Sequence, residues 1–182
     1  MDMIDTFDIR VGIQTGNILI TLVSYINAMN KLEANEPDEA NSEFVMDIGK
    51  LYTDMTAEEK RYALVHVAPI WYSRFYCKWL RYTRECEELG KTAPLWMTFR
   101  DLSETSEKLL AALVKHFDPI YSYTDAKVQA ALDKTLSITD QVRFNKGVGG
   151  RGEAYFSDDE KETIYNIMKT AGEEDLRKYG VL

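Results

Sequence analysis

Residues that form covalent cross-links or hold metal ions are scarce: the chain of 182 residues contains two cysteines and two histidines. Cys77 and Cys86 lie in one expected helix and face different directions, so a bridge between them would require backbone movement. The sequence therefore predicts neither a disulfide framework nor a metal site. His66 and His116 lie in apolar helical stretches and are expected to pack or to face solvent, so no catalytic residue is identified.

Basic residues are also fewer than acidic residues. The 22 Lys and Arg residues face 30 Asp and Glu, a net charge of −8, and no Lys/Arg-rich stretch stands out. Phosphate neutralisation needs a concentrated basic face, so a nucleic-acid partner is disfavoured. The most apolar stretch, residues 11–29, is too polar to span a bilayer, and the N-terminus has no signal pattern. We expect a cytoplasmic protein that binds neither nucleic acid nor membrane.

Helical signals dominate the sequence, and its length predicts a single domain. Asn17 can cap a helix, because its side chain can accept hydrogen bonds from the first free amides. The apolar positions of that helix recur at spacings of three and four: Leu19, Leu22, Val23, Ile26 and Met29. Two further helices begin at capping boxes, Thr56 with Glu59 and Ser157 with Glu160.

The sequence also indicates where helices end and where short strands can form. The helix after Thr56 is expected to reach about residue 89, kinked or split before Pro69, and the last helix to reach about residue 178. The acidic run 33–41 predicts a surface loop, and residues 135–156 a glycine-rich loop region. Residues 95–99 predict a buried strand, and residues 4–13 can supply a second. The expected fold class is mostly α with few strands.

The glycine-rich region carries a possible phosphate site, since its backbone amides can approach an anion closely. The residues that define its frame are Lys146, Gly147, Gly150, Phe156 and Ser157. This frame resembles the C-terminal signature of the PAPS-dependent sulfotransferases. Asn145 stands where that family has an arginine, and Arg151-Gly152 replaces its Asp-Trp pair.

Other pieces fall in the family's order. Phe99-Arg-Asp-Leu resembles the family's Tyr-Glu-Asp-Leu motif, and Thr135 matches one residue of the triplet that contacts adenine. Ser24 matches the serine that binds the 3′-phosphate, although Gly16 replaces the arginine that accompanies it. The resemblance implies part of an α/β sulfotransferase-like (P-loop-type) domain and PAPS or PAP as the cofactor. The implied cofactor-binding residues are Ser24, Phe99, Thr135, Asn145, Lys146 and Gly147.

Two parts of the family pattern have no counterpart here: the N-terminal phosphosulfate loop and the histidine that acts as general base. The resemblance therefore implies the family's C-terminal portion with at most a nucleotide half-site. Whether this chain is an enzyme stays open, because sulfuryl transfer needs charge stabilisation and usually a positioned base.

Two alternatives remain. Arg61 and His66 match the Arg-x₄-His spacing of the HEPN ribonucleases, all-helical proteins that act at a dimer seam. Aromatic residues also recur along one helix: Trp71, Tyr72, Phe75, Tyr76, Trp79 and Tyr82. Such a stripe is typical of a core, but an exposed stripe would favour a non-catalytic interaction or assembly protein, with a second chain or another copy as partner.

Overall fold

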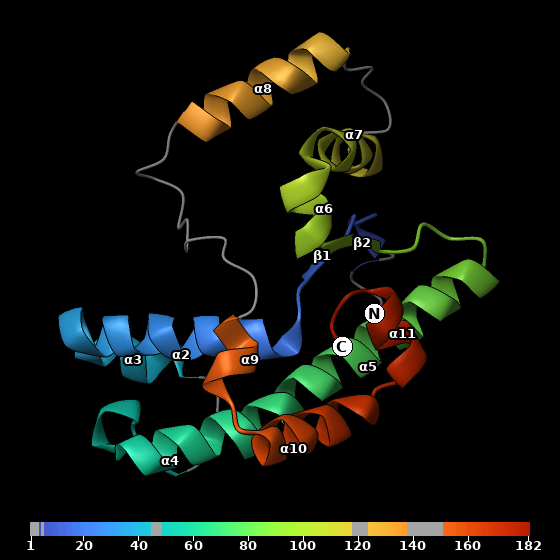
Figure 1. Ribbon diagram of the computed structural model, residues 1–182. Helices are drawn as coiled ribbons and strands as arrows, with labels where there is room; N and C mark the ends of the chain where they lie inside the picture. Colours follow the sequence, from blue (N-terminus) through green and yellow to red (C-terminus); the bar gives the residue numbers. More distant parts are fainter. Residues whose placement is uncertain (1–3, 5, 45–48, 118–123, 138–150) are drawn as a thin grey trace. The chain divides into compact units, whose positions relative to one another are not determined.

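The computed structural model describes residues 4, 6–44, 49–117, 124–137 and 151–182 (Figure 1). These residues group into two compact units. The first unit comprises the described residues of Met1–Gly16 and Trp79–Gly147, and the second those of Asn17–Lys78 and Val148–Leu182. The described chain is mostly helical, which confirms the expected predominance of α-structure.

The first unit contains a two-stranded parallel sheet. Strand β1 (Gly12–Thr15) pairs with β2 (Leu95–Thr98), with Gly12 opposite Leu95 and Thr15 opposite Thr98. Helices α6 (Phe99–Glu104), α7 (Ser106–Phe117) and α8 (Asp125–Ser137) follow β2. The strand expected over 95–99 is confirmed to residue 98, but all four of its residues are half-buried and not buried as expected. The second strand begins at the end of the expected 4–13 segment and continues to Thr15.

The second unit is helical throughout the residues that the structure describes. Its elements are α2 (Ile18–Asn35), α3 (Pro37–Glu43), a 3-10 turn (Tyr52–Asp54), α4 (Ala57–Tyr62), a π-helical turn (Ala63–Val67), the first part of α5 (Ala68–Glu88), α9 (Arg151–Tyr155), α10 (Asp158–Lys169) and α11 (Glu173–Lys178).

Helix α2 is the centre of the second unit. The Asn17 side chain caps it, accepting from the amides of Leu19 at 3.0 Å and Ile20 at 3.3 Å. All five apolar positions of the expected stripe are buried. Burying such aliphatic side chains contributes about 1.5–3 kcal/mol each. The Asn17 cap and the stripe are therefore confirmed.

The helix expected from Thr56 is divided where the sequence predicts a break. The Thr56–Glu59 capping box is present, and α4 runs through a π-helical turn directly into α5. Pro69 lies just after that turn. Because a proline ring clashes with the carbonyl four residues earlier, a wider turn at this point relieves the conflict.

Three expected boundaries are wrong. Over 33–41 the chain is helical except at Glu36, because Pro37 occupies the first turn of α3, where its missing N–H costs nothing. The last helix is divided: α10 ends at Lys169, and Gly172, with φ of 115°, directly precedes α11. At the edges of the expected 135–156 loop region, α8 extends to Ser137 and α9 occupies Arg151–Tyr155, while residues 138–150 lie outside the described residues.

Candidate functional site

The residues implied to bind a nucleotide are divided between the two units. Ser24 lies half-buried on α2 in the second unit, and Phe99 and Thr135 belong to α6 and α8 in the first. Asn145, Lys146 and Gly147 lie outside the described residues. The implied half-site therefore remains a prediction.

Phe99 lies at the carboxyl end of the parallel strands. It is the first residue of α6 and is 46% exposed, so the expectation that it belongs to a buried strand is wrong. The Thr98 hydroxyl caps α6 and donates to Asp101 Oδ2 at 2.7 Å, which lowers the pKa of the Asp101 carboxyl. Phe99 turns outward because its backbone already belongs to this capped helix.

Gly152, part of the glycine-rich stretch, has a packing role. A Cβ at this position would lie 2.6 Å from the carbonyl carbon of Leu19 and 2.8 Å from the nitrogen of Ile20. Both are backbone atoms of α2, so relieving the clash would require the helix itself to move. The glycine therefore allows α9 to approach α2 closely.

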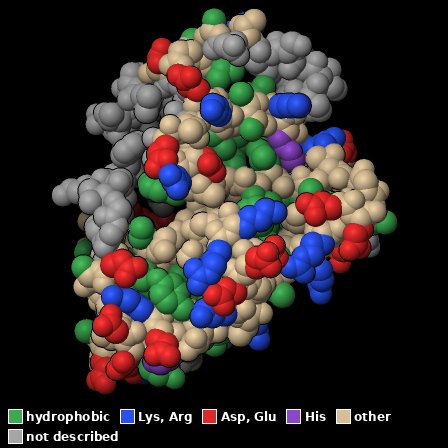
Figure 2. Space-filling model, turned by 45° about the vertical axis from the view of Figure 1, so that its right-hand side comes forward, with side chains coloured by type: hydrophobic (Ala, Val, Ile, Leu, Met, Phe, Trp, Pro, Cys, Tyr) green, Lys and Arg blue, Asp and Glu red, His purple; other side chains and the backbone are tan. Residues whose placement is uncertain are grey.

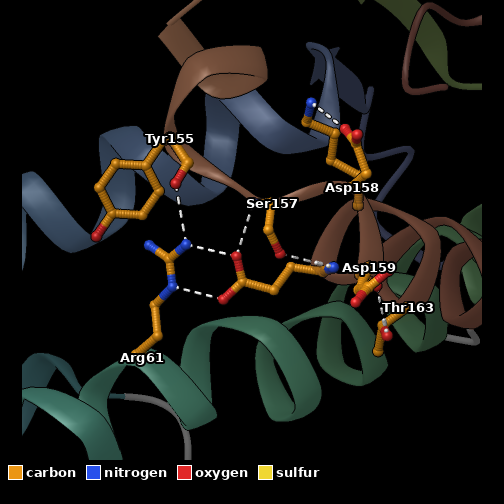
Figure 3. A network of polar contacts seen from close by, with 8 residues as sticks. Arg61, Tyr155, Ser157, Asp158, Asp159 and Thr163 are labelled. Carbon is orange, nitrogen blue, oxygen red and sulfur yellow. Dashed lines mark hydrogen bonds and ion pairs between the residues drawn. The ribbon is translucent and has the colours of Figure 1, made fainter.

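Arg61, one half of the Arg-x₄-His pattern, is held by a carboxylate (Figure 3). Its Nε donates to Glu160 Oε1 at 2.7 Å, and its Nη2 donates to Glu160 Oε2 at 2.6 Å and to the Tyr155 carbonyl at 2.9 Å. The guanidinium also lies 4.4 Å from the centre of the Tyr155 ring. These hydrogen bonds from Arg61 lower the pKa of Glu160 to about 2. This bidentate pair joins α4 to the start of α10.

The two histidines have different surroundings. His66 is exposed, and its ring centre lies 4.6 Å from that of Tyr62. Among the described residues, no hydrogen bond or ring contact joins His66 to Arg61. His116 Nε2 lies 3.0 Å from the Val11 carbonyl, so this histidine packs α7 against the chain entering β1. Both positions fit the expectation that each histidine packs or faces solvent.

The aromatic stripe on α5 is divided by burial. Tyr76 and Tyr82 are core residues at 4% and 5% exposure, and burial raises the pKa of Tyr76 to about 12. Trp71, by contrast, is 44% exposed. Its ring stacks on Phe75 with centroids 5.8 Å apart and planes 11° apart. Part of the stripe is therefore core, and part forms surface.

Charged residues complete the exposed part of α5. Arg74 and Lys78 are exposed and, within the part of the chain that the structure describes, form no ion pair. They lie on the same helical face as Ile70, Trp71 and Phe75, since positions four apart are neighbours on a helix. We call these five residues, all in the second unit, the α5 face. Arg74 and Lys78 are not among the residues identified from the sequence; their spacing of three and seven residues from Trp71 is the signal that could have indicated them.

The wider surface carries both signs of charge. Figure 2 shows Lys and Arg side chains interspersed with Asp and Glu over one side of the molecule, with hydrophobic side chains between them. Within the described ranges, no group of three or more His, Cys, Asp and Glu residues is placed to hold a metal ion. Likewise, none of the described helices is long and apolar enough to cross a membrane.

No family model matches the chain, and neither a curated protein nor a solved structure matches it. The candidate functional features of the described chain are the α5 face, the carboxyl ends of the parallel strands and the polar network around Arg61.

Proposed function

We propose that this chain is a helical assembly protein that contacts a second copy of itself through the α5 face. The observation that supports the proposal is the stacked pair of Trp71 and Phe75 on an exposed helix surface. Large aromatic side chains dominate the energetics of protein interfaces, because they bury much area and lose few rotamers on binding.

A second copy fits this face because the chain carries the complementary charge. Asp159 and Glu162 on α10 are exposed and, among the described residues, have no ion pair. They can meet Arg74 and Lys78 of another copy, and both sets belong to the second unit. A contact between two different surfaces of the same chain is heterologous, so it builds rings or open chains.

The proposal is tested by sedimentation equilibrium over a range of protein concentrations. We expect the wild type to self-associate and Trp71→Ala to weaken association by about 2 kcal/mol or more, roughly 30-fold in the dissociation constant. Leu51→Ala is the matched control, since Leu51 is 55% exposed in the same unit but lies outside the α5 face. A monomeric mass throughout, or equal loss with Leu51→Ala, contradicts the proposal.

A second candidate function is nucleotide binding of the sulfotransferase type. Two features favour it: ligands bind outside the carboxyl ends of parallel strands, and exposed Phe99 lies there. In this candidate Phe99 stacks on adenine, while the Asp101 carboxylate keeps the phosphates of PAP away from the start of α6.

PAP itself tests this second candidate. A ligand that binds only the folded state raises the melting temperature, and we expect a dissociation constant no better than roughly 10⁻⁴ M, because both family arginines are replaced. Phe99→Ala and Lys146→Ala should each reduce the shift, whereas Phe117→Ala, another exposed phenylalanine, should preserve it. No shift at millimolar PAP rules the candidate out.

A further inference from the structure

A pocket in the second unit is lined by side chains that offer hydrogen-bond donors. Its volume is about 270 Å³, just below the roughly 300 Å³ at which small-molecule sites begin. Its lining residues come from α2, α4 and α9: Ile26, Asn30, Ala57, Lys60, Arg61 and Tyr155.

Asn30 offers a hydrogen-bond donor at this pocket. Asn30 Oδ1 accepts from the buried Tyr52 hydroxyl at 2.6 Å, which leaves its Nδ2 group available. The amide orientation follows from that bond, because a phenol whose pKa burial raises stays protonated and donates. In the described part of the chain, no partner binds Asn30 Nδ2.

Both cations of the pocket are held by carboxylates, and Lys60 retains an N–H group. Lys60 Nζ bonds both oxygens of Glu33, at 2.6 and 2.7 Å, and an ammonium has three protons. Arg61 uses Nε and Nη2 for Glu160 and the Tyr155 carbonyl, and the hydrogen bonds to Glu160, together with the Tyr155 phenol, raise the pKa of its guanidinium (Figure 3). Their carboxylate partners hold both cations in place at the pocket.

We infer that this pocket binds a small organic carboxylate. The Nδ2 group of Asn30 and the remaining N–H group of Lys60 donate to the carboxylate oxygens. Ile26, Ala57 and the Tyr155 ring provide an apolar wall for the body of the ligand. Because Glu33 and Glu160 already balance the two cations, the pocket has no surplus positive charge to hold the two charges of a phosphate.

The inference is independent of the assembly proposal, since none of the pocket residues belongs to the α5 face. The probe is benzoate, whose size suits the pocket, with benzamide as the neutral isostere and inorganic phosphate as the alternative oxyanion. Binding is followed by isothermal titration calorimetry. We expect saturable binding of benzoate and none of benzamide or phosphate.

Asn30→Asp provides the matched variant. It keeps the acceptor for Tyr52 but replaces the Nδ2 donor with a negative charge, and we expect benzoate binding to weaken roughly tenfold to a hundredfold. Asn27→Asp makes the same charge change at an exposed position on α2 outside the pocket and should bind as the wild type does. Ala57→Leu, which fills the pocket without removing a polar group, should also abolish binding.

Equal binding of benzoate and benzamide, binding of phosphate alone, absence of benzoate binding, or equal losses in Asn30→Asp and Asn27→Asp would each overturn the inference. Circular dichroism of each variant establishes that it is folded. Should Asn30→Asp fail to fold, Ala57→Leu decides by itself, and unchanged benzoate affinity in that variant counts against the pocket.

Discussion

At the residue scale, the most consequential pair is Arg61 and Glu160. Their bidentate hydrogen bonds connect positions 99 residues apart and join the helix before the π-helical turn to the start of α10. Glu160 also accepts from the Ser157 amide at 2.8 Å as part of its capping box. One carboxylate therefore caps a helix and anchors a cation.

Replacing Glu160 by Gln should destabilise the fold by about 1–2 kcal/mol, because the pair is only partly shielded from solvent. The measurement is urea unfolding at pH 7. Glu162→Gln is the control, since Glu162 is exposed on the same helix, and its unfolding free energy should be unchanged. Equal losses in the two variants would show that the Arg61 pair contributes nothing specific.

The same pair predicts a dependence on pH. The folded pKa of Glu160, about 2, lies below its usual value of 4.5, so the stabilisation is complete above about pH 4.5 and is lost as the pH falls toward 2. Unfolding curves across this window should show a steeper acid loss for the wild type than for Glu160→Gln. Parallel curves would contradict the assignment.

At the element scale, the close approach of α9 to α2 depends on Gly152. Gly152→Ala should cost about 1–3 kcal/mol, because the added methyl group meets the α2 backbone and the helices must separate. Gly90→Asn is the comparison: Gly90 ends α5 with φ 63°, has open space around it, and asparagine tolerates that conformation. Thermal unfolding of both variants measures the difference, and equal costs would contradict a packing role for Gly152.

Elements that depend on local chemistry could be predicted from the sequence. Asn17, Thr56 and Ser157 each cap a helix, and each cap depends on residues within three positions. The strand at 95–98 followed from a short apolar run with turn signals on both sides. The prediction of a loop over 33–41 is wrong because it followed the acidic composition of the run. It did not take into account that proline is favoured at the first position of a helix, which Pro37 occupies in α3.

Features that depend on distant partners could not be predicted. Periodicity placed Trp71 and Tyr76 on one helix but could not establish that Tyr76 would be covered and Trp71 left exposed. Likewise, Arg61 could be noticed only for its spacing from His66, since its partner Glu160 lies far along the chain. The pocket beside it combines side chains of three helices, so no single stretch of sequence indicates it.

At the scale of the whole molecule, association between copies depends on the local charges at the contact and not on the net charge. Two copies that each carry −8 repel weakly at physiological salt, because interactions between exposed charges are screened beyond about 8 Å. An ion pair between Arg74 or Lys78 of one copy and an exposed carboxylate of another is shorter than that distance, so its attraction is not screened in the same way. In the proposed assembly, apolar contact through Trp71 and Phe75 supplies the affinity, and the charges select the partner surface.

The most direct test of the central claim is a charge exchange measured by sedimentation velocity. One variant carries Arg74→Glu with Lys78→Glu, and the other carries Asp159→Lys with Glu162→Lys. Each variant alone should be monomeric, because one of its two contact surfaces has the wrong sign. We predict that mixing the two variants restores assembly with the two variants alternating in equal numbers, since the reversed surfaces of one complement those of the other and the unchanged surfaces still match. Two variants that stay monomeric in the mixture, or that assemble as well alone as the wild type does, would contradict the account.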